Sequence, residues 1–243
     1  PGPEQQPPHW QHSKQSPAVY HFVFSELLPI VQRDSIQSIS GKCNHHVCII
    51  TALIDSRVNF REDRSSLKFI DGAPAMPDNW TMHAPMVINA LGDNLIYVLE
   101  YGHGRAIVVD PGQAKDVLGT IEQRGWRLSH ILCTHHHWDH IGGVGEIAEA
   151  TGCDVVALGK KRQSNVHVTV EDGQVIPLGA IEITAIATPG HTADSVCYYV
   201  SAKGQPDRSI VFTGDTLFIG GCGRIFECDA EVMYDSLQKL AAL

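Results

Sequence analysis

From Met82 onward, short apolar runs alternate with segments in which apolar residues recur at helical spacing. Short apolar runs bounded by turn residues predict strands, and the helical spacing predicts helices. We expect strands at 94–100, 106–110, 130–134, 154–158, 181–188, 196–200 and 209–215. We expect helices at 114–125, 144–152 and 229–243, the first of them ending at Gly125. This succession of strands, helices and further strands predicts a layered α/β domain.

The region before this domain differs in composition and shows no clear pattern of strands and helices. Residues 1–17 are rich in Pro and Gln, which indicates an unfolded arm, and we assign no fold to residues 1–80. The segment CNHHVC at 43–48 could be a zinc knuckle or an incidental cluster. The second interpretation is favoured, because no second ligand pair follows at a suitable spacing. We therefore place the functional domain at 81–243.

Composition narrows the range of partners. The chain has 243 residues, with 18 Lys and Arg against 27 Asp and Glu, so its formal net charge is −9. An acidic chain is poorly suited to nucleic acid or to an anionic membrane surface, and no apolar run approaches the roughly 20 residues of a membrane helix. Seven irregularly spaced cysteines and the lack of a secretory signal in this sequence favour a cytoplasmic setting. We expect a monomer that acts on a small molecule.

The segment THHHWDH at 134–140 concentrates metal-binding side chains in one loop. A loop at the end of a strand can present alternate residues to one side, which places His135 and His137 together, with Asp139 and His140 just beyond. His136, in the middle, is expected to point away. A fortuitous histidine run, like a purification tag, would not lie between an apolar strand and a helix. The segment therefore predicts a metal site.

Two later strand ends supply further donors, His191 in TPGHT and Asp215 in FTGDT. Each is weak alone, because a histidine in such a turn is more often not a ligand and an aspartate there usually caps a turn or a helix. The three loops in this order, however, resemble the metallo-β-lactamase superfamily. That resemblance implies an αββα sandwich that holds one or two metal ions.

Within the superfamily the chain resembles glyoxalase II, the hydroxyacylglutathione hydrolase family, in its bacterial-type form. The resemblance rests on the blocks INALGDNLIYVL, VVDPG, THHHWDHIGG, ATPGHTADSVCYYV and FTGDTLFIGGCGRIFE, and it runs almost continuously over 82–243. It implies two divalent ions, zinc first, with iron or manganese as alternatives. It assigns six ligands: His135, His137 and His191 to the first ion, Asp139 and His140 to the second, and Asp215 to both.

The same resemblance implies hydrolysis of S-D-lactoylglutathione to glutathione and D-lactate, a step of methylglyoxal detoxification. Asp139 and Asp215 are then the catalytic carboxylates, beside a water activated by two cations. In GGCGRIF (220–226), a glycine-rich turn with one guanidinium suits an anionic peptide-like substrate, although a surface arginine in a tight turn explains it equally well without the family. By resemblance, Arg224 and Phe226 contact the substrate.

The family also has parts without a counterpart here, namely a further strand that carries a metal-ligand histidine and a helical domain. We therefore expect a C-terminally incomplete domain with a weak second metal site. Two alternatives stay open. One is an iron-dependent persulfide dioxygenase of the same superfamily, which the residues Ile225, Phe226 and Glu227 disfavour. The other is an inactive metal-binding fragment.

Overall fold

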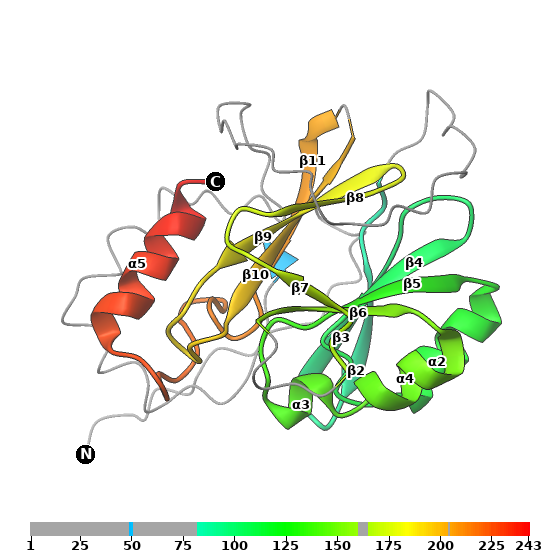
Figure 1. Ribbon diagram of the computed structural model, residues 1–243, viewed down its shortest axis with the longest axis horizontal. Helices are drawn as coiled ribbons and strands as arrows, with labels where there is room; N and C mark the ends of the chain where they lie inside the picture. Colours follow the sequence, from blue (N-terminus) through cyan, green and yellow to red (C-terminus); the bar gives the residue numbers. More distant parts are fainter. Residues whose placement is uncertain (1–48, 51–81, 160–164, 204) are drawn as a thin grey trace, which may run out of the picture.

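The computed structural model describes residues 49–50, 82–159, 165–203 and 205–243. The expectations for the N-terminal arm and for the Cys43–Cys48 cluster lie outside these residues. Within the described residues, two β-sheets pack face to face and helices cover their outer sides (Figure 1). The predicted α/β sandwich of αββα type is therefore confirmed.

The first sheet has six strands in the order β2-β3-β4-β5-β6-β7. The pairs β2–β3 and β3–β4 are antiparallel, and β4 to β7 run parallel to one another. The strands are β2 (Met86–Ala90), β3 (Asn94–Glu100), β4 (Arg105–Val109), β5 (Arg127–Leu132), β6 (Asp154–Leu158) and β7 (Val168–Val170). Three helices follow strands of this sheet: α2 (Lys115–Arg124), α3 (Trp138–Ile141) and α4 (Val144–Thr151).

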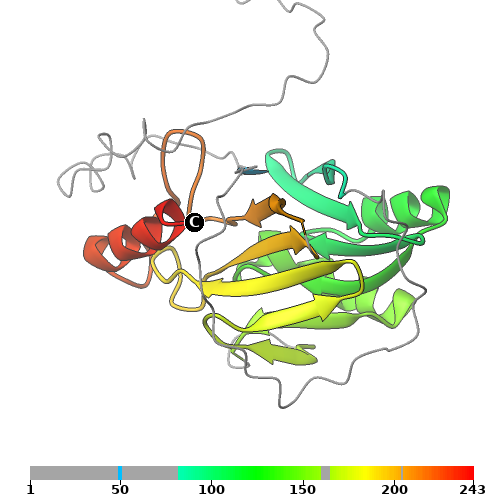
Figure 2. The same cartoon turned by 90° about the horizontal axis from the view of Figure 1, so that it is seen from above.

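The second sheet has five antiparallel strands in the order β1-β11-β10-β9-β8. Its strands are β1 (Ile49–Ile50), β8 (Val175–Leu178), β9 (Ile181–Ala187), β10 (Val196–Ala202) and β11 (Gln205–Phe212). In Figure 2 the yellow and orange strands of this sheet lie side by side, with α5 (Ala230–Ala241) beyond them. The Asp229 side chain caps α5 by accepting from Val232 N at 3.0 Å, as an N-cap aspartate commonly does.

Three apolar clusters separate the four layers. The largest lies between the sheets and is built from inward residues such as Leu99, Tyr198 and Phe212. A second cluster packs α2 and α4 on the six-stranded sheet, and a third packs α5 on the five-stranded one. Burial of apolar surface on this scale is the main contribution that stabilises such a sandwich.

Two contacts between the sheets fix the strand end that precedes the histidine loop. The buried Tyr198 hydroxyl, on β10, donates to the carbonyl of Cys133 at 2.9 Å. The amide of Val196, at the start of β10, donates to the carbonyl of Thr134 at 2.8 Å. The loop therefore begins from a rigid point between the two sheets. Among the described helices, none is both long and apolar enough to cross a membrane.

Candidate metal centre

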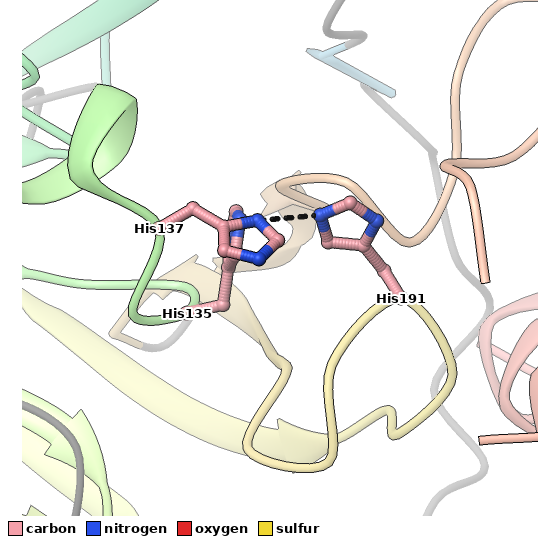
Figure 3. A group of neighbouring side chains, drawn as sticks. All are labelled: His135, His137 and His191. Atoms are coloured by element: carbon pink, nitrogen blue, oxygen red, sulfur yellow. Dashed lines mark hydrogen bonds between the residues drawn. The ribbon is translucent and has the colours of Figure 1, made fainter. Parts of the chain in front are cut away.

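Three loops, each following a strand, bring the predicted donors to one place. His135 and His137 follow β5, His191 follows β9, and Asp215 follows β11. Figure 3 shows the rings of His135, His137 and His191 directed toward one another from two of these loops. His135 and His191 are buried, whereas His137 is half-buried, so the group opens to solvent on one side.

Four atoms form what we call the first donor set, from His135, His137, His191 and Asp215. His135 Nε2 and His191 Nε2 lie 3.1 and 3.0 Å from His137 Nδ1. Asp215 Oδ2 lies 3.3 Å from His191 Nε2. Donors around a tetrahedral zinc ion, each about 2.0–2.1 Å from it, are roughly 3.3 Å apart. Both the donor types and their spacing therefore fit one divalent metal ion.

A second donor set adjoins the first and comprises His140, Asp139 and the other oxygen of Asp215. His140 Nε2 lies 3.3 Å from Asp215 Oδ1 and 3.6 Å from Asp139 Oδ2. The two oxygens of Asp215 thus face different donor sets. This placement suits a carboxylate shared by two ions.

The far nitrogens of three rings are held by partners that fix the tautomer. His191 Nδ1 donates to the carbonyl of Arg224 at 2.6 Å, and His140 Nδ1 donates to Asp110 Oδ2 at 2.9 Å. His135 Nδ1 lies 3.0 Å from Thr134 Oγ1, whose own proton goes to Asp110. Since each Nδ1 carries a proton, each Nε2 offers a lone pair to the centre. Metal-ligating histidines are typically oriented in this way.

Asp110 is a site residue that the sequence prediction missed. Its buried carboxylate accepts from Thr134 N at 2.7 Å and Thr134 Oγ1 at 2.6 Å, as well as from His140. Its backbone has a φ of 50°, a conformation that Asp adopts more readily than most residues. Asn94 was missed too, although its Nδ2 donates to Asp139 Oδ2 at 3.1 Å and to Asp139 O at 3.0 Å. Both residues lie in sequence blocks that resemble the family, VVDPG and INALGDNLIYVL, so the resemblance could have indicated them.

Two glycines let the Asp215 loop approach its neighbours. Gly214 has a φ of 48°, and a Cβ there would collide with the Thr134 side chain. A Cβ on Gly223 would collide with the backbone oxygen of Asp215. Only glycine permits such close packing without a shift of the backbone, so these two positions keep Asp215 beside the histidine loop.

The four histidines of the two donor sets and Asp215 have pKa values shifted in different directions. Burial, with the neighbouring imidazoles, holds the pKa of His135 well below its usual range, and burial lowers the pKa of His137 and of His191. Burial also opposes charge on His140, but the charges and hydrogen bonds of Asp110 and Asp215 outweigh it and raise that pKa well above the usual range. Burial opposes charge on Asp215 as well, yet His140 and the other histidines lower its pKa.

The two residues predicted to contact substrate lie beside the first donor set. The Phe226 ring is exposed and lies 5.6 Å, centroid to centroid, from His137 and 5.2 Å from His191. The Arg224 guanidinium carbon lies 5.6 Å from the Phe226 ring centroid. Both side chains therefore border the open side of the centre. His136 joins neither donor set and instead contacts Asp194.

An αββα sandwich that gathers histidine and aspartate donors at its strand ends defines the class of this protein. Residues 90–243 match the family model of the metallo-beta-lactamase superfamily, and the chain belongs to that superfamily.

Within the superfamily, the chain is similar to a curated relative and to solved structures. A hydroxyacylglutathione hydrolase of Rhodospirillum rubrum is 43% identical over 159 residues, which is 64% of this chain and 60% of the relative, so the chain spans about 60% of its length. The crystal structure of ETHE1 from Myxococcus xanthus is 30% identical and superposes with a TM-score of 0.56, covering 65% of this chain and 69% of that one. TTHA1623, solved in a di-iron-bound form, is 26% identical with a TM-score of 0.53, covering 65% of this chain and 86% of that one.

Proposed function

We propose that the chain is a metal-dependent thioester hydrolase that converts S-(2-hydroxyacyl)glutathione, with S-D-lactoylglutathione as its substrate, to glutathione and the free 2-hydroxy acid. The observation that carries the proposal is the position of Asp215, whose two oxygens face His191 on one side and His140 on the other. Such a shared carboxylate suits a two-metal hydrolytic site. The similarity to hydroxyacylglutathione hydrolases supports the choice of substrate.

Six residues would hold the ions. The first donor set offers three imidazoles and one carboxylate, and the second offers one imidazole and two carboxylates, with Asp215 in both. Nitrogen and carboxylate donors accept zinc, iron or manganese. Zinc is the proposed occupant, and the di-iron form of TTHA1623 supports iron as an alternative.

Bound divalent ions would supply a hydrolytic nucleophile from water at neutral pH and would polarise the thioester carbonyl. The chain orients the reactants. Asn94 anchors Asp139 by donating to both its side chain and its backbone carbonyl, and the Asp139 side chain is 35% exposed. We assign it to hold the attacking water by accepting one of its protons. Water adds to the thioester carbon, the C–S bond breaks, and the thiolate leaves and takes up a proton.

Arg224 and Phe226 would bind the glutathione part of the substrate. A guanidinium can pair with a glutathione carboxylate through two parallel hydrogen bonds. The exposed Phe226 ring offers an apolar surface beside the His137 and His191 rings. These contacts would place the thioester next to the donors.

A persulfide dioxygenase of the same superfamily, with one iron on two histidines and an aspartate, is the second candidate. The second donor set favours the hydrolase, because a mononuclear site leaves His140 and Asp139 without a ligand role. A metal-binding protein without catalytic activity is the third candidate, because catalysis depends on substrate positioning as well as on bound metal.

The test is to load the purified chain with zinc, and separately with iron, and to supply S-D-lactoylglutathione or glutathione persulfide. The hydrolase releases free thiol from the thioester without consuming oxygen. Oxygen uptake with the persulfide and no thiol release would establish the dioxygenase. Metal binding without either reaction would establish a metal-binding protein without catalytic activity.

A further inference from the structure

His136 is the one histidine of the THHHWDH segment that belongs to neither donor set. Its Nδ1 lies 2.8 Å from Asp194 Oδ1, and its Nε2 lies 3.9 Å from Glu227 Oε1. Because a carboxylate only accepts, the Nδ1 of His136 carries the proton and donates to Asp194. The His136 ring is therefore placed between two carboxylates that come from two other loops.

These contacts join three segments that are far apart in the sequence. His136 lies in the histidine loop, Asp194 follows His191, and Glu227 follows the turn that contains Arg224 and Phe226. Glu227 also links the last two segments directly, because its Oε2 accepts from the amide of Ala193 at 2.8 Å. The side chains are mostly shielded, with 21% of His136, 19% of Asp194 and 25% of Glu227 exposed.

Segment 222–228 contains Arg224 and Phe226, the two residues that border the metal centre. The amide of Phe226 donates to the His191 carbonyl at 3.2 Å, and the amide of Gly223 donates to the Asp215 carbonyl at 3.0 Å. These backbone bonds attach the segment along the side of His191 and Asp215. Glu227 adds an attachment at its far end, directly after Phe226, through the amide of Ala193, and His136 Nδ1 holds the adjoining Asp194.

We propose that His136 is a positioning residue. It acts as a clamp by holding Asp194, next to the Ala193 amide on which Glu227 is anchored, and so sets the placement of segment 222–228 with Arg224 and Phe226. The substrate side of this proposal rests on the proposed hydrolase function. His136 supplies no atom to either donor set, and its ring lies edge-on beside His137, with 5.0 Å between the ring centroids. Its expected effect is on substrate affinity, because the groups that it places bind substrate in the ground state and the transition state alike.

A cation held by His136, Asp194 and Glu227 is the competing interpretation, since one donor atom from each lies within 4.8 Å of the others. The ring geometry disfavours it. Asp194 faces Nδ1 and Glu227 faces Nε2, and the lone pairs of these two nitrogens diverge. An ion bound to either ring nitrogen would therefore have one carboxylate within reach. That makes two protein ligands, fewer than a structural metal site normally has.

The experiment compares four zinc-loaded full chains: unsubstituted, His136→Ala, His136→Asn and His83→Ala. Asn places an amide near the position of Nδ1 and so keeps the donor to Asp194. His83 is exposed and lies before β2, so it is the matched control. Three quantities are measured on each: metal content, hydrogen exchange of the 222–228 amides, and kcat and KM for S-D-lactoylglutathione.

For His136→Ala we expect unchanged metal content, about tenfold faster exchange in 222–228, and a KM raised about tenfold with kcat within about twofold, since a hydrogen bond to a charged group is worth roughly one power of ten. His136→Asn should reverse most of the change in exchange rate and in KM, because the donor to Asp194 is kept. His83→Ala should match the unsubstituted chain.

The clamp is overturned if exchange in 222–228 is unchanged in His136→Ala. Loss of one metal ion per chain establishes the cation site instead. If the unsubstituted chain hydrolyses no thioester, the proposed function fails, and the exchange data alone decide the clamp.

Discussion

Nδ1 of His191 donates to the backbone carbonyl of Arg224 at 2.6 Å. A residue of the first donor set is thus oriented by the same residue that borders the open side of the centre. The contact uses the arginine backbone, and the guanidinium lies toward the Phe226 ring instead. The orientation of His191 and the proposed role of the Arg224 side chain can therefore be separated by substitution.

Arg224→Ala should weaken the use of glutathione thioesters and leave metal content intact, because the carbonyl that holds His191 is kept. Loss of a charge-assisted hydrogen bond should raise KM for S-D-lactoylglutathione about tenfold or more. Steady-state kinetics and elemental analysis on the same preparation test this. Arg224→Lys should recover only part of the loss, because an ammonium cannot make the paired contact. A fall in metal content equal to the fall in activity would mean that the side chain is structural.

The donor assignment predicts that the double substitution His135→Ala and His137→Ala removes bound metal. Two of the four members of the first donor set disappear, and a divalent ion held by few protein donors binds weakly. Elemental analysis after gel filtration should show less than about one tenth of the unsubstituted content. The control is His136→Ala, in the same loop, which should keep its metal. Unchanged metal in the double variant would disprove the assignment.

Much of the site could be predicted from the sequence because its donors follow strands with a clear apolar pattern. The runs around Ile131 and Val211 indicate strands, so His135 and Asp215 had to lie at strand ends. The short helix α3 inside the histidine loop was not predicted, because four residues carry no periodicity. The strands β2, β7 and β8 were also missed, since they are short and interrupted by polar residues or by Pro177.

The supporting contacts could not be predicted from local pattern. Asp110 and His140 are 30 residues apart, and only the parallel placement of β4 beside β5 brings their ends together. The contact of His136 with Asp194 spans 58 residues and depends on the packing of loops from two sheets. The expectation that His136 points away from the donors agrees with the structure, but its partners follow from tertiary packing alone.

Asp110→Asn should destabilise the metal-free chain by about 3 kcal/mol, because an uncharged amide cannot accept all three hydrogen bonds and leaves a buried donor unsatisfied. Asn tolerates the positive φ at this position, so backbone strain does not contribute. Urea unfolding monitored by circular dichroism measures the change. The control is Lys239→Ala, which removes an exposed ion pair with Asp172 and should cost less than about 1 kcal/mol. Equal effects of the two substitutions would contradict the structural role of Asp110.

The last prediction concerns the order in which the two donor sets take up metal as the pH rises. In the folded metal-free chain the pKa of His140 is raised, so its protonation stabilises the fold fully below about pH 6.5 and this contribution is lost as the pH rises through the raised pKa. An ion at the second donor set has to displace that proton. The pKa values of His135, His137 and His191 are lowered instead, so these rings lose their protons at a lower pH than a free imidazole does and are mostly neutral by about pH 6.5.

Protons therefore compete with metal at the second donor set but hardly at the first. At modest zinc and about pH 6.5 we expect close to one ion per chain, and a second ion only with excess zinc and at higher pH. Equilibrium dialysis across pH, with zinc measured in each compartment, gives the stoichiometry. His140→Ala is the matched variant: it should keep the first ion and lose the pH-dependent second one, because it removes the competing proton together with the only imidazole of that set. Uptake of both ions with a single pH midpoint would mean that the two sets load as one unit, and that Asp215 couples them more strongly than the His140 proton separates them.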